Sequence, residues 1–253
     1  MDATGEETVT AAVTVPQAVF LLALDDETGR PLVDRSALAQ VLSAAGLVEL
    51  IMLGRLRIAG PAGAESGVDA DAKPGTFVAV GQPLDPAGAD ADLEALVETA
   101  VGRKPDSAVK LIVGFGGPKS EATKLKEGIA EEFVDAGVLG HEEKKFLGGT
   151  FSERWPRGEN AQLEDSIQAE ARALLTGEVE PRETDRVAAA LALLHAVRVL
   201  PRVFPDLDRA SISKRAEELI DSAAVAGELG KMIREAQLVM MTTVATLVIT
   251  TRD

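Results

Sequence analysis

Residues 19–58, VFLLALDDETGRPLVDRSALAQVLSAAGLVELIMLGRLRI, are the stretch that decides the fold of this 253-residue chain. A turn cluster rich in Asp, residues 25–29, follows the short apolar run that opens it. Asp34 or Ser36 is then placed to cap a helix that is apolar nearly all round, and the rest of a domain packs against such a helix. Gly54 predicts a left-handed end to this helix, and the alternating residues after it predict an edge strand.

Outward from this stretch, the pattern predicts helices with small hairpins between them. The alternating residues 55–58 and the strand signal at residues 77–80 predict a hairpin after the central helix. Apolar periodicity, capping residues and glycine or proline punctuation predict the remaining helices. In chain order, these run from Asp90 or Asp92 to about residue 101, from about 119 to 136, from 160 to 176, from Glu183 or Thr184 to a break at Pro201 and Pro205, from Asp208 or Ser211 to about 224, and from 228 to 249.

The predicted fold class is therefore mostly α, as a single domain over residues 18–253 with small β-hairpins. Residues 1–17 predict a flexible acidic tail that lacks the basic region of a signal peptide. The apolar residues 236–251 fall short of the roughly 20 residues that a membrane-spanning helix needs, so a buried core element is predicted there.

The composition narrows the classes of function. The chain has no cysteine and two histidines, so a disulfide framework is excluded and no metal or cofactor is predicted. Of the net charge of −15, residues 1–99 carry −11, from 16 acidic and 5 basic side chains. This acidity argues against nonspecific nucleic-acid binding and against adsorption to an anionic membrane through general charge. An anion site must therefore be local, and the balanced residues 100–160 are where a basic patch fits.

No motif defines a catalytic site. The segment VGFGGPKS, residues 113–120, resembles a phosphate loop, but Pro118 replaces the glycine before the lysine. An interhelix turn is the favoured interpretation. His195 lies in an apolar helical pattern typical of a core histidine, and neither it nor His141 has a Ser or Asp at a triad spacing. We therefore predict no catalytic residue and a protein that is not an enzyme.

Trp155 is the only tryptophan, and the segment SERWPRG around it allows two interpretations. In the first, the ring caps the local core. In the second, it inserts at a membrane interface, where Trp is enriched, and Arg154 and Arg157 face lipid phosphates. The core interpretation is favoured, because a single aromatic side chain is weak support for insertion.

Several segments, in order and spacing, carry a resemblance to a known family. They are LLALDDETG at 21–29, LVEL and GRL around residue 54, PAGADADLEAL at 86–96, FVDAGVL with KKFLG at 133–148, and RETDRVAAALALLHAVRVL at 182–200. Together they are similar to the Golgi phosphoprotein 3-like family, peripheral membrane adaptors that bind phosphatidylinositol 4-phosphate. The resemblance implies a central bundle of apolar helices surrounded by amphipathic helices. The Ala-, Gly- and Val-rich composition suggests a bacterial member.

The resemblance also implies a lipid head-group pocket. Matched by spacing, Asp34 and Ser43 fall where the family has a Trp and an Arg near its first helix. Thr123 and Lys126 fall where it has two later Arg residues. Lys126 alone among these four keeps a positive charge, which acts on phosphate as a point charge rather than as the fork of an Arg.

Two neighbouring cations and a hairpin complete what the resemblance implies. Arg35 and Lys124 lie next to the changed pocket positions and are candidate substitutes for the lost charges. The segment KKFLGGTFSERWP matches the family's hairpin, which implies self-association and membrane contact. The residues proposed for that role are Phe151, Arg154, Trp155 and Arg157.

The expected function is a non-enzymatic peripheral membrane adaptor that binds anionic phospholipid head groups through residues around Lys124 and Lys126. The expected location is the cytoplasm, with association at the inner face of the membrane. The alternative is a soluble protein-interaction scaffold that has lost lipid binding, which the acidic charge balance supports. Protein partners and a homo-oligomer formed through the hairpin are further expectations, and nucleic acid is not an expected partner. Steep salt dependence would distinguish lipid binding from the scaffold.

Overall fold

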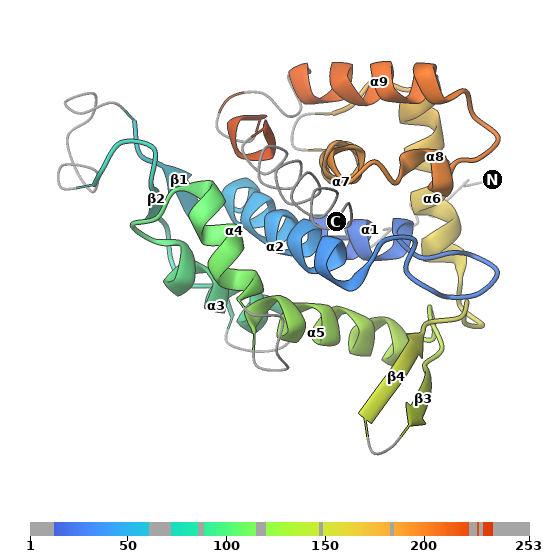
Figure 1. The fold of residues 1–253 in the computed structure, drawn as a ribbon. Helices are drawn as coiled ribbons and strands as arrows, with labels where there is room; N and C mark the ends of the chain where they lie inside the picture. The colour runs from blue at the N-terminus through green and yellow to red at the C-terminus, as the bar shows by residue number, and fades with distance from the viewer. Residues whose placement is uncertain are drawn as a thin grey trace, which may run out of the picture.

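The computed structural model describes residues 13–60, 72–85, 89–114, 120–146, 149–182, 185–222, 227 and 230–234. Helices dominate these residues, and short hairpins lie at the edges (Figure 1). The helices are α1 (Val15–Leu22), α2 (Arg35–Met52), α3 (Ala89–Ala100), α4 (Pro105–Val113), α5 (Glu121–Asp135), α6 (Gln162–Thr176), α7 (Arg186–Ala196), α8 (Leu200–Val203) and α9 (Arg209–Asp221). The strands are β1 (Leu56–Ile58), β2 (Phe77–Ala79), β3 (Glu142–Phe146) and β4 (Gly149–Arg154). The predicted mostly α fold with small hairpins is confirmed.

α2 is the helix around which the others pack. It contacts α1, α3, α4, α5 and α7, and it runs through the middle of the view in Figure 1. Asp34 caps it by accepting a hydrogen bond from the Ala37 amide at 2.9 Å. Beyond its end, Gly54 has φ of 66°, a left-handed conformation that glycine adopts without a steric penalty. The predicted order of turn, buried helix, glycine and strand is confirmed.

α1 begins inside the segment that the sequence assigned to a tail. Thr14 and Gln17 form a reciprocal capping box, so residues 15–17 belong to the helix, and the predicted boundary after residue 17 is wrong. The reason is that the apolar run starts at Val15 and is preceded by a good cap, a signal that the acidic composition obscured. Residues 1–12 lie outside the described residues.

A buried carboxylate joins the three apolar helices α1, α2 and α7. Glu49 of α2 is fully buried and accepts a hydrogen bond from the Val15 amide at 2.8 Å. Arg186 of α7 donates to the same carboxylate through Nε at 2.9 Å and Nη2 at 2.8 Å. These partners offset the high cost of removing a charge from water. The amphipathic helices α5, α6 and α9 pack around this centre, which confirms the arrangement that the resemblance implied.

The two hairpins differ in length and position. β1 and β2 pair antiparallel from Leu56 opposite Ala79 to Ile58 opposite Phe77, which confirms the hairpin predicted after the central helix. β3 and β4 are longer, and their register shifts between residues 144 and 145. In Figure 1 this second hairpin extends away from the helices, beyond one end of α5.

Proline and the chain ends account for the main differences in helix boundaries. Pro201 does not end a helix as predicted. It lies in the first turn of α8, where a backbone N–H has no partner within the helix, so the missing N–H of proline costs no hydrogen bond. The break comes earlier, at Arg198, whose φ is 57°. Pro118, at the predicted start of α5, lies outside the described residues, and α5 begins after Ser120 instead. Of the predicted last helix, only residues 230–234 are described, and they are helical.

Candidate functional site

The site predicted around Lys126 lies where α5 meets the β3–β4 hairpin. Ser120 caps α5 by accepting a hydrogen bond from the Thr123 amide at 3.2 Å, and Lys126 follows in the second turn. Its ammonium Nζ lies 2.7 Å from Oε2 of Glu153, which is in β4. The two side chains are 20% and 25% exposed, so the ion pair is partly enclosed but within reach of solvent.

The ring of Trp155 contacts the ammonium of this ion pair. The Lys126 Nζ lies 5.1 Å from the centre of the Trp155 ring, within the range of a cation–π contact. The ring packs edge-on against Phe20 of α1, with centroids 5.2 Å apart, and the residue is only 4% exposed. The core interpretation of Trp155 is therefore confirmed. Almost no surface of this ring is exposed for insertion into a membrane.

Backbone contacts hold the base of β4 against the turn between α1 and α2. Trp155 donates its N–H to the Gly29 carbonyl at 2.7 Å. Gly29 has φ of 63°, and a Cβ atom there would clash with the Pro156 nitrogen. Only glycine accommodates both the left-handed backbone and this close approach. Glu153, two residues before Trp155, is therefore carried on a strand end that has little freedom to move.

Three of the four predicted pocket positions serve the helices that carry them. Asp34 is exposed and its carboxylate is engaged as the cap of α2. Ser43 is fully buried and donates its hydroxyl to the Ala39 carbonyl at 2.7 Å, so it offers no surface to a ligand. The Thr123 hydroxyl lies 2.9 Å from that of Ser120 at the start of α5.

The two candidate substitutes lie on different helices: Arg35 is the exposed first residue of α2, and Lys124 lies in α5. Lys124 is paired with Glu121 at 2.9 Å on the surface of α5.

Of the hairpin residues named from the sequence, Phe151 and Arg154 belong to β4, and Trp155 and Arg157 belong to the segment after it. Arg157 forms an ion pair with Asp165 of α6. The Nε atom of Arg154 is enclosed and has no hydrogen-bond partner among the residues that the structure describes. The side chain of Phe151 lies outside the described residues. Of the hairpin residues whose side chains the structure describes, Trp155 is the one shown in contact with Lys126.

Sequence reasoning missed Glu153, the carboxylate that holds Lys126. The signal was present: residues two apart on a strand point to the same face, so Glu153 and Trp155 face α5 together once β4 is assigned. The segment SERWP suggested roles for Trp155 and Arg154 and none for Glu153. The missing information was the contact between Glu153 of β4 and Lys126 of α5, which lie 27 positions apart.

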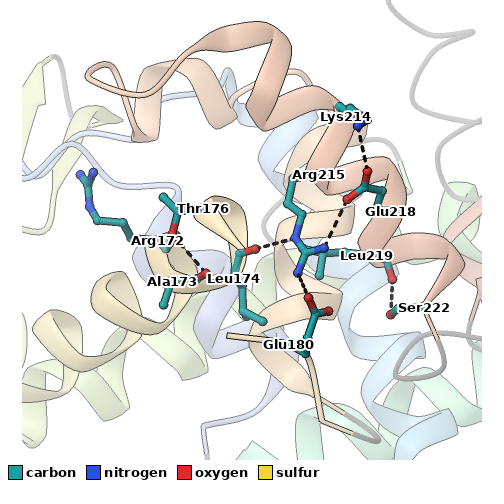
Figure 2. Close-up of polar contacts among 10 residues, drawn as sticks. All are labelled: Arg172, Ala173, Leu174, Thr176, Glu180, Lys214, Arg215, Glu218, Leu219 and Ser222. Atoms are coloured by element: carbon teal, nitrogen blue, oxygen red, sulfur yellow. Dashed lines mark hydrogen bonds and ion pairs between the residues drawn. The ribbon is translucent and has the colours of Figure 1, made fainter. Parts of the chain in front are cut away.

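A second enclosed cation lies at the other end of the molecule, between α6 and α9. Arg215 of α9 donates its Nε to the Leu174 carbonyl at 2.9 Å, in the last turn of α6 (Figure 2). Its guanidinium also forms ion pairs with Glu180 at 3.1 Å and with Glu218 at 3.2 Å. Figure 2 shows these carboxylates converging on the guanidinium from two elements. Arg215 therefore binds the C-terminal end of α6.

Other ionisable groups give no catalytic arrangement within the described ranges. No group of three His, Cys, Asp or Glu side chains there could hold a metal ion. His195 is half-buried on α7, where burial lowers its pKa and Glu217, 3.9 Å away, opposes the shift. Burial raises the pKa of the Glu164 carboxyl at the start of α6, against the effect of Arg157. The absence of an enzymatic activity stays a prediction.

One of the described helices, α2, is long and apolar enough to cross a membrane by length and composition. Most of its residues are buried inside the protein, as in the core helix of many folds. The composition of α2 is explained by its central place in the packing, and it carries no argument for a membrane span.

The fold and this junction define a helical domain with one partly enclosed lysine at the base of a hairpin. The sequence model of the Golgi phosphoprotein 3 (GPP34) family matches residues 15–236. Because this match covers most of the chain, the protein belongs to the Golgi phosphoprotein 3 family, which confirms the resemblance. The match begins at Val15, the first residue of α1. A search of curated protein sequences finds no match to the chain.

Proposed function

We propose that this protein is a non-enzymatic peripheral membrane adaptor that binds anionic phospholipid head groups where α5 meets the β3–β4 hairpin. Membership of the Golgi phosphoprotein 3 family supports an adaptor of phosphoinositide membranes at the level of the family. Phosphatidylinositol 4-phosphate is the head group that the family resemblance implies. Association at the cytoplasmic face of a membrane and a bacterial origin are parts of the same proposal.

The observation that carries the proposal is the position of the Lys126 ammonium. Lys126 is the one predicted pocket residue that keeps a cation, and an acidic oxygen already lies 2.7 Å from its Nζ. That distance is normal for a charge-assisted hydrogen bond, and a phosphate oxygen makes the same kind of contact. The 20% exposure of the side chain leaves a path for a ligand from solvent.

The acidity of the chain sets the expected character of this binding. With a net charge of −15, the protein as a whole is repelled by an anionic surface, so attraction must come from a few local contacts. Exposed charges are screened over a Debye length of about 8 Å at physiological salt. Binding through a partly enclosed lysine should therefore fall with salt, yet persist at physiological ionic strength.

The test is flotation of the full chain with vesicles of phosphatidylcholine alone and of phosphatidylcholine with phosphatidylinositol 4-phosphate. We expect the unaltered protein to float with the second set and Lys126→Gln to remain in the soluble fraction. Lys214→Gln is the matched control, because Lys214 is an 80% exposed lysine of α9 that also pairs with a glutamate. It should float like the unaltered chain.

Two outcomes would contradict the proposal. Equal flotation of the Lys126 and Lys214 variants would mean that the lipid site does not lie where α5 meets the β3–β4 hairpin. No flotation of any variant would favour the alternative, a protein-interaction scaffold without lipid binding, which the negative charge of the chain supports. Self-association through the hairpin is a separate proposal, which sedimentation of the full chain tests.

A further inference from the structure

His141 lies beside the Trp155 ring at the base of the β3–β4 hairpin, one residue before β3. Its imidazole stacks on the indole, with ring centroids 6.2 Å apart and the planes 18° from parallel, and the residue is exposed. The Lys126 Nζ lies 5.1 Å from the centre of the same indole and is partly exposed. His141 and Lys126 therefore cannot lie farther apart than these two distances together.

The backbone on both sides of His141 is paired with the segment around Trp155. The Gly140 N–H before it donates to the Pro156 carbonyl at 2.7 Å. Glu142 after it stands opposite Arg154 in the hairpin. The imidazole is therefore carried at a defined position between the end of α5 and the hairpin, close to the lysine of the proposed lipid site.

Charged side chains from three elements surround this position. Lys126 comes from α5 and is paired with Glu153 of β4, while Glu142 of β3 stands opposite Arg154 of β4. Over the whole hairpin, residues 142–154, three glutamates balance two lysines and one arginine. Lys126 then gives this junction, taken as Lys126 with residues 142–154, its net positive charge. A proton on His141 doubles that net charge.

Histidine is the side chain that ordinarily changes its charge between pH 5 and 8, and the chain has only two of them. A protonated imidazole donates hydrogen bonds from both ring nitrogens, and those to phosphate are charge-assisted. The separation from Lys126 is comparable with the Debye length of about 8 Å at physiological salt, so a charge on His141 also acts on a phosphate held by Lys126.

We propose that His141 is a second phosphate contact of this site, and that it joins Lys126 at a lipid head group only when its imidazole is protonated. Lipid binding then strengthens as the pH falls from about 8 to about 5.5. The inference rests on the proposed function, because it needs the junction of α5 and the hairpin to be the lipid site. It adds a second binding residue and a dependence on pH.

The experiment compares the unaltered chain with His141→Gln by flotation at about pH 8 and about pH 5.5, at physiological salt. The vesicles contain phosphatidylcholine with phosphatidylinositol 4-phosphate. The binding of the unaltered chain, divided by that of the variant, should be near one at the higher pH. It should reach about fivefold at the lower pH, the factor that one added cation gives near an anionic surface. The phosphomonoester loses charge at the lower pH for both proteins alike, so this loss cancels from the ratio.

Two further variants separate a charged contact from a packing role of the imidazole. His195→Gln is the matched control, because His195 is the other histidine of the chain and lies half-buried on α7. It should follow the unaltered chain at both pH values. His141→Lys carries a positive charge at both, so it should bind about fivefold more than the unaltered chain at the higher pH. Loss of a ring needed only for packing would weaken binding instead.

The outcomes separate this inference from the proposed function. If the unaltered chain floats but its ratio to His141→Gln is the same at both pH values, the inference fails alone. If neither protein floats at either pH, the proposed function fails and takes the inference with it. An equal loss of the acid-dependent gain in His195→Gln would assign the gain to the net charge of the chain. Flotation at the lower pH with phosphatidylcholine alone would assign it to adsorption without phosphate, and either result contradicts the inference.

Discussion

Two cations of this protein are enclosed to the same degree and yet have different environments. Lys126, at the hairpin, is 20% exposed, and Arg215, between α6 and α9, is 18% exposed. Arg215 donates to a backbone carbonyl at the end of α6, and its guanidinium is also paired with two glutamates (Figure 2). Lys126 is held by one carboxylate and the face of a ring. A cation bound only by side chains can exchange its partner, whereas one bound to a helix end cannot do so without loosening the fold.

The largest loss of stability in this comparison is expected where the hairpin meets the core. Trp155→Ala would remove a ring that packs against Phe20 and is 4% exposed. We expect the free energy of unfolding to fall by about 4 kcal/mol, within the range for truncating a buried aromatic side chain. Chemical denaturation followed by far-UV circular dichroism measures it. Trp155→Phe is the control and should lose less than half as much, whereas equal losses would mean that the ring is not packed as described.

A smaller loss is expected at the opposite end of the molecule. Arg215→Met keeps most of the side-chain volume but removes the hydrogen bond to Leu174 and both ion pairs. The free energy of unfolding should fall by about 2 kcal/mol, as for the loss of hydrogen bonds to a charged group. The neighbouring Lys214→Met, at an 80% exposed position, should change it by less than about 0.5 kcal/mol.

The same Arg215→Met variant sharpens the comparison through its second readout. Because Arg215 is proposed to act only on the fold, vesicle flotation at a temperature where the variant is folded should equal that of the unaltered chain. A folded Arg215→Met variant that no longer floats with the vesicles would contradict the division between the two cations.

The sequence predicted the central helices well, because their signals are local. The cap at Asp34, the apolar residues of α2 and the glycine that follows them are adjacent in the chain, and each has one physical meaning. The start of α1 was missed because the acidic composition before it outweighed a capping box of four residues. Pro201 was misjudged because proline ends a helix in its interior but is tolerated in the first turn.

The candidate site was harder to predict, because its contacts join distant segments. Lys126 was found through the family spacing, but Glu153 reaches it across 27 residues, and no local pattern encodes that pairing. Ser43 was placed in the pocket by spacing, although the packing of α2 buries it completely. The two readings of Trp155 also depended on tertiary packing, which its contact with Phe20 decides.

A third charged group, Glu164, gives the smallest expected effect and a pH dependence. It is 2% exposed at the start of α6, and burial raises the pKa of its carboxyl, while Arg157 opposes the shift and Asp26 and Asp165 add to it. The stability that this group contributes is present below its unfolded pKa and is lost as the pH rises through the raised folded value.

Glu164→Gln removes this titration while keeping the shape of the side chain. The variant should therefore melt above the unaltered chain at pH 8, and the two melting temperatures should converge below pH ~4, near the ordinary pKa of Glu. Thermal unfolding followed by circular dichroism at several pH values measures the difference. Melting curves that stay parallel over the whole range would contradict an enclosed, titrating carboxyl at this position.

The most direct test of the central claim measures Lys126→Gln for stability and lipid binding in the same preparation. An ion pair that is partly exposed contributes roughly 0.2–1 kcal/mol, so the melting temperature should stay close to that of the unaltered chain. Flotation with phosphatidylinositol 4-phosphate vesicles at physiological salt should nevertheless be lost. A folded Lys126→Gln variant that floats like the unaltered chain would contradict the account, because the cation would then be as structural as Arg215.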